Sequence, residues 1–187
     1  MHSGINNSSI NRQINIPSNV NVEKINNLYI FKGPNGTINC ETPEKIIINI
    51  QNNIITIQSL ITKKDKKNKK YALINTICAI FKNHIKGVVD LFEKSVIIKG
   101  IGYKAEYKDL TLKLFLGYSH PVTYKIPEDI KIELLTQTSI SIKGISKHKV
   151  GQIADEIRRK KPADSYKGNG IKYKNDTTKL KSPKKTK

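Results

Sequence analysis

The chain contains no tryptophan, only two cysteines and one methionine, and just 6% aromatic residues in a length of 187. Cys40 and Cys78 lie far apart, form no Cys-x-x-Cys motif and have no histidine at ligand spacing, so we predict neither a zinc site nor a disulfide framework. This use of cysteine fits a reducing compartment. No segment approaches the ~20 uncharged apolar residues of a membrane span.

Acidic residues are also scarce, because 34 Lys and Arg outnumber 15 Asp and Glu and leave a formal net charge of +19. Self-repulsion at this charge disfavours a compact state unless a polyanion screens it, which makes nucleic acid the favoured partner. An anionic membrane is the weaker alternative, since the basic segments lack a broad apolar face, and we predict no membrane partner. The first 19 residues show neither an apolar signal core nor an Arg-rich helix, so no cleavable address is expected.

The second half of the chain reads as short antiparallel strands followed by a helix. Apolar residues that alternate with polar ones predict the strands, and the alternating sets are Leu110, Leu112, Leu114 and Leu116; Ile130, Ile132 and Leu134; and Ile140 and Ile142. Helical spacing then places four residues on one face: Val150, Ile153, Ala154 and Ile157. Ser146 is the expected N-cap, and Pro162 is expected to end the helix.

The first half repeats this order. Tyr29–Phe31, Ile46–Ile50 and Ile54–Ile57 read as strands, and a helix follows whose apolar face comprises Ile74, Ile77, Cys78, Phe81 and Ile85. The segment Pro43–Ile46 also matches Pro127–Ile130, and each begins a strand pair. Internal duplication is the economical interpretation, with coincidence in an Ile-rich chain as the alternative. We therefore expect an α+β fold of two duplicated domains, each a small antiparallel sheet covered by one helix, with domains at 1–88 and 89–162 and a basic RNA-binding tail at 163–187.

The end of the chain carries the strongest functional signal, because residues 158–187 hold 12 Lys or Arg and only two Asp. Within it, glycines permit close backbone approach to a polyanion, lysines neutralise phosphates, and tyrosine can stack on a base. The predicted RNA-binding residues are Arg158, Arg159, Lys160, Lys161, Tyr166, Lys167, Gly168, Gly170, Ile171 and Lys172. A flexible tail of turn residues is the competing interpretation. The lysine run Lys63–Lys70 is either a solvated loop or a second phosphate contact.

The sequence contains no convincing enzyme motif. Gly100-Ile101-Gly102 lacks the third glycine and the acidic partner of a dinucleotide site and reads as a tight turn. Ser119 and His120 are adjacent, so they cannot act as nucleophile and base in ordinary strand geometry. We predict no catalytic residues, no cofactor, no metal and no small-molecule substrate.

Five motifs in order resemble the family of bacterial-type large-subunit ribosomal protein six. They are Ile16-Pro17, Lys32–Gly36, Lys99–Ala105, Leu116–Val122 and Tyr166–Ile171, and the resemblance covers nearly the whole chain. It implies a duplicated α+β fold and a structural, non-enzymatic role in the large ribosomal subunit, bound to large-subunit ribosomal RNA near the factor-binding region and beside neighbouring ribosomal proteins. The rival function is a free-standing nucleic-acid-binding protein on the same scaffold outside ribosomes.

The chain departs from that family's C-terminal signature, which usually reads Pro-Glu-Pro-Tyr-Lys-Gly-Lys-Gly-Ile. Here Ala163-Asp164-Ser165 precedes Tyr166, and Asn169 replaces the second lysine, so one phosphate contact is expected to be missing. The heavy use of Ile, Asn and Lys is typical of an AT-biased genome, and the resemblance leaves little room for a transit peptide. We therefore expect an organellar ribosome, plastid before mitochondrion, with an AT-rich bacterium third.

Overall fold

A computed structural model describes residues 11–43, 46–59, 67–177 and 180–181. The chain divides into two compact units, Met1–Asp90 and Leu91–Lys187, called unit 1 and unit 2 below. Residues 63–66 of the lysine run Lys63–Lys70 lie outside the described residues, and for residues 67–70 only the backbone is described, so the role of the run stays a prediction.

Unit 1 contains six strands and one helix, and unit 2 contains seven strands and one helix, within the part of the chain that the structure describes. In unit 1 they are β1 (Arg12–Asn15), β2 (Asn21–Ile25), β3 (Leu28–Gly33), β4 (Gly36–Glu41), β5 (Ile46–Gln51), β6 (Ile54–Ser59) and α1 (Lys67–Val89). In unit 2 they are β7 (Phe92–Lys99), β8 (Lys104–Lys108), β9 (Thr111–Phe115), β10 (Val122–Lys125), β11 (Ile130–Thr136), β12 (Ser139–Gly144), α2 (Lys147–Lys160) and β13 (Gly170–Tyr173).

The two units share one topology. Unit 1 has sheets ordered β1-β6-β5 and β2-β3-β4, and unit 2 repeats them as β7-β12-β11 and β8-β9-β10. All pairings between these strands are antiparallel. The predicted α+β class and internal duplication are confirmed. Each unit has two small sheets rather than one, because a loop, residues 16–20 or 100–103, separates the first strand from the three-stranded meander that follows.

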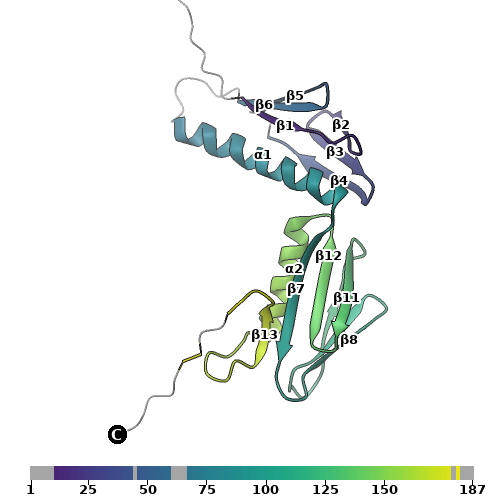
Figure 1. Ribbon diagram of the computed structural model, residues 1–187, viewed down its shortest axis with the longest axis vertical. Coiled ribbons are helices and arrows are strands. Elements are labelled where there is room, and N and C mark those ends of the chain that lie inside the picture. The colour runs from purple at the N-terminus through teal and green to yellow at the C-terminus, as the bar shows by residue number, and fades with distance from the viewer. Residues whose placement is uncertain (1–10, 44–45, 60–66, 178–179, 182–187) are drawn as a thin grey trace, which may run out of the picture. The chain divides into compact units, whose positions relative to one another are not determined.

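Unit 2 adds one strand that has no counterpart among the described strands of unit 1. Strand β13 pairs antiparallel with the free edge of β7 and lies beside it in Figure 1, so this sheet has the order β11-β12-β7-β13. It belongs to the segment that we assigned to a basic tail. The chain after α2 therefore returns to the sheet of unit 2 before it continues.

Helix α1 packs along one side of the strands of unit 1 (Figure 1). The predicted apolar face is confirmed, since Ile74, Ile77, Cys78, Phe81 and Ile85 are all buried. Phe81 anchors the helix on β3, with its ring centre 5.3 Å from that of Tyr29 and 5.0 Å from that of Phe31. Aromatic pairs at such separations add to the stabilisation from burial alone.

The predicted apolar face and the predicted N-cap of helix α2 are both confirmed. Val150, Ile153, Ala154 and Ile157 are all buried. The Ser146 hydroxyl oxygen accepts a hydrogen bond from the Lys149 N–H at 3.4 Å, which satisfies one of the free donors of the first turn. The helix ends at Lys160, two residues before Pro162.

The predicted position of Leu110 on the apolar face of a strand is wrong. Leu112, Leu114 and Leu116 are buried as expected, but Leu110 is 43% exposed. Asp109 and Leu110 have φ values of 50° and 56°, because they form the turn of the β8–β9 hairpin. Two successive positive φ values match the right-handed twist of the flanking strands, so this tight turn outweighs the alternating pattern at Leu110.

Candidate nucleic-acid interface

Three successive cations lie in the last turn of α2 and a fourth, Lys161, is its C-cap, but Arg158 and Arg159 are held by one carboxylate. Asp155 Oδ1 accepts hydrogen bonds from Arg158 Nε at 3.1 Å and Nη2 at 2.7 Å, and Oδ2 lies 2.7 Å from Arg159 Nε. The hydrogen bond from Arg158 holds the pKa of Asp155 below its ordinary value. Arg159 nevertheless keeps 75% of its side chain exposed, so part of its guanidinium still faces solvent.

Lys161 holds three loops of unit 2 together. Its Nζ donates to the carbonyl oxygen of Leu116 at 2.7 Å and lies 5.1 Å from the ring centre of Tyr103 and 4.4 Å from that of Tyr118. The Tyr118 hydroxyl in turn donates to the carbonyl oxygen of Lys160 at 3.1 Å. The ammonium of half-buried Lys161 is thus engaged within unit 2, where cation–π contacts and a hydrogen bond stabilise it.

Asp164 organises the turn that carries Tyr166 and Lys167. Its two carboxylate oxygens accept hydrogen bonds from the N–H of Tyr166 at 3.2 Å and of Lys167 at 3.0 Å. These backbone donors, with that of Lys167 foremost, lower the pKa of Asp164. The Gly168 N–H donates to the Asp164 carbonyl oxygen at 2.9 Å, and its φ of 70° closes the turn. Tyr166 is left 60% exposed at the tip of this turn.

Gly170 and Ile171 dock the end of this loop on unit 2. Gly170 has a φ of 134°, and a Cβ there would lie only 2.5 Å from the carbonyl oxygen of Pro162. The Ile171 N–H donates to the carbonyl oxygen of Lys161 at 2.7 Å, and its side chain is 1% exposed in the core. Gly168 and Gly170 both have positive φ values, a conformation that glycine adopts readily. Both glycines serve the path of the chain itself.

The ten predicted residues thus divide by what their side chains contact. Lys161 and Ile171 are engaged within unit 2, and Arg158 and Arg159 pair with Asp155. Lys160, Lys167 and Lys172 have no ion pair within 4 Å among the described residues, and they flank the exposed ring of Tyr166 in the sequence. The docked loop therefore presents one exposed aromatic ring and, among the described residues, three lysines that form no ion pair within 4 Å.

Sequence reasoning missed Lys99 at this site. Lys99 ends β7, pairs in register with Gly170, and places its Nζ 3.9 Å from where a Cβ of Gly168 would lie. It brings another cation to the turn from a position far away in the sequence. The sequence signal for Lys99 was its position next to the turn residue Gly100. Only the pairing of β7 with β13 shows that Lys99 lies beside the turn at Gly168.

Among the described residues, no group of three or more His, Cys, Asp or Glu side chains gathers in a way that could hold a metal ion. Across the same residues, no helix is long and apolar enough to cross a membrane.

Comparison with known proteins identifies the family. The family model described as Ribosomal protein L6 matches residues 16–90 and 99–174, one segment in each unit. The chain is 41% identical over 160 residues to the large ribosomal subunit protein uL6 of Ruthia magnifica, covering 86% of this chain and 88% of that one. It is 39% identical to the uL6 protein of Mycoplasmoides gallisepticum (89% and 90% covered) and 38% identical to that of Thioalkalivibrio sulfidiphilus (93% and 96%).

These matches extend over both duplicated units and the docked C-terminal loop up to Lys174. They agree with the resemblance that the five sequence motifs carried, and the family is one of structural proteins rather than enzymes. The chain belongs to the ribosomal protein L6 family.

Proposed function

We propose that this protein is a structural constituent of the large ribosomal subunit, where unit 2 binds large-subunit ribosomal RNA through the loop 161–172. Family membership supports the ribosomal role. The observation that supports the RNA contact is the exposed Tyr166 ring on a turn fixed by Asp164, beside lysines that form no ion pair within 4 Å among the described residues.

The loop supplies two kinds of contact that RNA binding needs. Ammonium groups of Lys160, Lys167 and Lys172 can neutralise phosphates, which positions the protein without reading sequence. The Tyr166 ring can stack on an unpaired base or a sugar. Because the turn is held by hydrogen bonds before binding, little backbone entropy is lost when RNA arrives.

The position near the factor-binding region and the contacts with neighbouring ribosomal proteins come from the family resemblance and are part of this proposal. The proposed location in an organellar ribosome, with a plastid favoured over a mitochondrion, rests on the AT-biased composition. The relatives named above come from bacteria, so an AT-rich bacterium stays as an alternative.

Sedimentation tests the ribosomal role. We expect the protein in a lysate of its native organism to cosediment with the large ribosomal subunit in a sucrose gradient at moderate salt, and to leave it only at high salt. Fractionating organelles first assigns the compartment. Light fractions at both salts would instead support the free-standing nucleic-acid-binding protein.

Replacing Tyr166 with alanine is expected to weaken binding to large-subunit ribosomal RNA by about 1–3 kcal/mol, because one stacking platform is lost. Filter binding with the purified chain and Tyr166→Ala measures the difference. Tyr166→Phe is the matched control, since it keeps the ring and should bind as the natural chain does. Equal affinity of all three proteins would remove Tyr166 from the interface.

Replacing Lys167 with alanine is expected to weaken binding uniformly across RNA sequences and to reduce the salt slope of log K by about 0.7–0.9, the value for one neutralised phosphate. Binding constants at several salt concentrations measure that slope. Lys131→Ala is the control, because Lys131 is exposed on β11, which β12 and β7 separate from β13. An unchanged slope for Lys167→Ala would contradict a phosphate contact there.

A further inference from the structure

Strand β1 has an outer edge that no described strand covers. It is the first strand of the sheet β1-β6-β5 and pairs only with β6 among the described residues. Just after it, the N–H of Ile16 donates to the carbonyl oxygen of Asn53 at 2.8 Å, on the β6 side. Since backbone groups alternate along an antiparallel strand, Gln13 and Asn15 direct theirs to the outer edge. This edge is a template for one more strand.

Unit 2 shows which kind of segment fits the equivalent edge. There, β7 takes the place of β1, and the N–H of Ile98 donates to the carbonyl oxygen of Thr138 at 2.8 Å, just as Ile16 bonds Asn53. The outer edge of β7 is covered by β13, and the carbonyl oxygen of Ser95 accepts the N–H of Lys174 at 3.0 Å. In this alignment Gln13 of β1 corresponds to Ser95.

Two side chains of β13 fill the space between β7 and α2. Ile171 lies opposite Ile98 and is 1% exposed in the core. Tyr173 lies opposite Val96, with Lys94 Nζ 3.9 Å and the Arg158 guanidinium carbon 5.1 Å from its ring centre. An aliphatic side chain and an aromatic one, two residues apart, thus seal this edge. Two cations contact the aromatic ring, and the Tyr173 hydroxyl donates a hydrogen bond to Asp155 Oδ1 at 3.2 Å.

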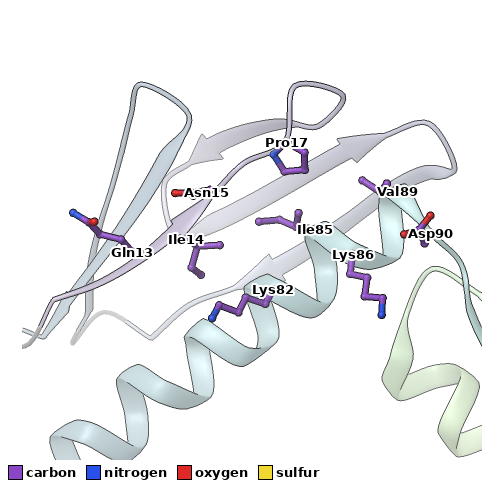
Figure 2. Close-up of a pocket in the computed structure, with 9 residues that line it drawn as sticks. All are labelled: Gln13, Ile14, Asn15, Pro17, Lys82, Ile85, Lys86, Val89 and Asp90. Atoms are coloured by element: carbon purple, nitrogen blue, oxygen red, sulfur yellow. The ribbon is translucent and has the colours of Figure 1, made fainter.

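Unit 1 has open pockets where those two side chains would lie. The pocket in Figure 2 has a volume of about 510 Å³ between β1 and α1, and its apolar lining includes Ile14, Pro17, Ile85 and Val89. A second pocket of about 430 Å³ follows along the same strand and helix and is lined by Arg12, Lys82 and Cys78, among others. Together they form what we call the β1–α1 groove.

The cations of the second pocket correspond to those around Tyr173. Arg12 lies opposite Ile57 on β6, as Lys94 lies opposite Ile142 on β12. The buried faces of the two helices align in the same way, with Ile74, Ile77, Cys78 and Phe81 matching Val150, Ile153, Ala154 and Ile157. This alignment places Lys82 at the position of Arg158. Arg12 and Lys82 are therefore placed to hold an aromatic ring that the described part of unit 1 does not supply.

We propose that the β1–α1 groove binds an extended segment of another protein, which adds to β1 as an antiparallel strand. Its signature is aliphatic-x-aromatic, with the aliphatic residue opposite Ile16 and the aromatic one opposite Ile14. Carboxylates beside this signature complement the positive charge of Arg12 and Lys82. Main-chain hydrogen bonds to Gln13 and Asn15 supply affinity, and the two pockets supply specificity.

The occupant is a segment of another protein rather than of this chain or of RNA. The undescribed segments of this chain contain no Tyr, Phe or Trp, so none of them carries the signature. RNA would satisfy the cations, but it offers no alternating donors and acceptors at strand spacing to pair with Gln13 and Asn15. The aliphatic pocket would also stay empty.

A peptide titration tests this proposal. The ¹⁵N-labelled full chain is titrated with the peptide acetyl-Glu-Gly-Ile-Glu-Tyr-Glu-amide, which keeps the spacing of β13 and replaces its lysine with glutamate. We expect saturable shifts of the Gln13 and Asn15 amide signals. Replacing the peptide tyrosine with alanine should weaken binding about tenfold, because the cation–π contacts are lost.

The protein variant Asn15→Pro removes one outward N–H, which an edge strand tolerates while its inner pairing persists. It should abolish peptide binding while the amide signals of β6 stay in place, and Asn15→Ala should bind normally. Peptide shifts that are absent from β1, or unchanged by Asn15→Pro, overturn the proposal. Binding of the peptide only after residues 1–10 are deleted also overturns the proposal, because it would mean that the full chain fills its own groove. An RNA oligonucleotide that saturates the same amide signals, with no effect of the peptide, would overturn it as well.

Discussion

The variant Ile153→Asp is expected to unfold unit 2. Ile153 is 5% exposed on the face of α2 that packs on the sheet, among Val150, Ala154 and Ile157. An aspartate there would bring a carboxylate into an apolar core cluster that contains no buried cation. An uncompensated buried charge costs about 3–5 kcal/mol, comparable with the whole stability of about 5–15 kcal/mol of an ordinary domain. Two-dimensional NMR and thermal denaturation measure the loss.

The control Gln152→Asp adds the same charge one residue earlier, on the exposed face of α2. It removes the hydrogen bond from Gln152 Nε2 to Glu156 Oε1 at 2.9 Å, so a loss of about 0.5–1.5 kcal/mol is expected, with unit 2 still folded. Signals of unit 1 should persist in both variants, because the two units are separate compact bodies. Native-like signals of unit 2 in Ile153→Asp would contradict the assignment of this helix face.

The helices could be predicted from the sequence because burial is periodic on a face that packs against a sheet. The four apolar positions of α2 and the five of α1 are all buried, and Ser146 caps α2. A long amphipathic pattern carries this information locally. Leu110 was placed wrongly because the positive φ values of a two-residue turn depend on the strands that the turn joins.

The candidate site could be predicted only in outline. Charge and glycine content marked the loop 161–172, but the partners of its side chains come from elsewhere in the chain. Lys161 is held by the carbonyl of Leu116 and two tyrosine rings, and Lys99 reaches the turn through the β7–β13 pairing. Strand β13 itself has only four residues, too few for alternation to distinguish it from a tail. Such contacts depend on tertiary structure and leave no local pattern.

Gly170 shows how closely the loop 161–172 depends on its docking against β7. A Cβ at this position would lie 2.5 Å from the carbonyl oxygen of Pro162 and 2.7 Å from Cα of Ala163, both backbone atoms that cannot rotate away. Its φ of 134° is also a conformation that residues with side chains rarely adopt. Gly170→Ala must therefore move the backbone, and the backbone strain alone costs about 1–3 kcal/mol.

We expect Gly170→Ala to release β13 from β7, to expose Ile171 and to weaken binding to ribosomal RNA more than Tyr166→Ala does, because the whole loop loses its fixed position. Hydrogen exchange measures the release, since the amide of Lys174, which donates to Ser95, should exchange faster. Gly151→Ala is the matched control: a Cβ there meets open space within α2, and the change should stabilise the helix by about 1 kcal/mol. If Gly170→Ala keeps slow exchange at Lys174 and full RNA affinity, the loop does not need this glycine, and the link between docking and RNA binding is wrong.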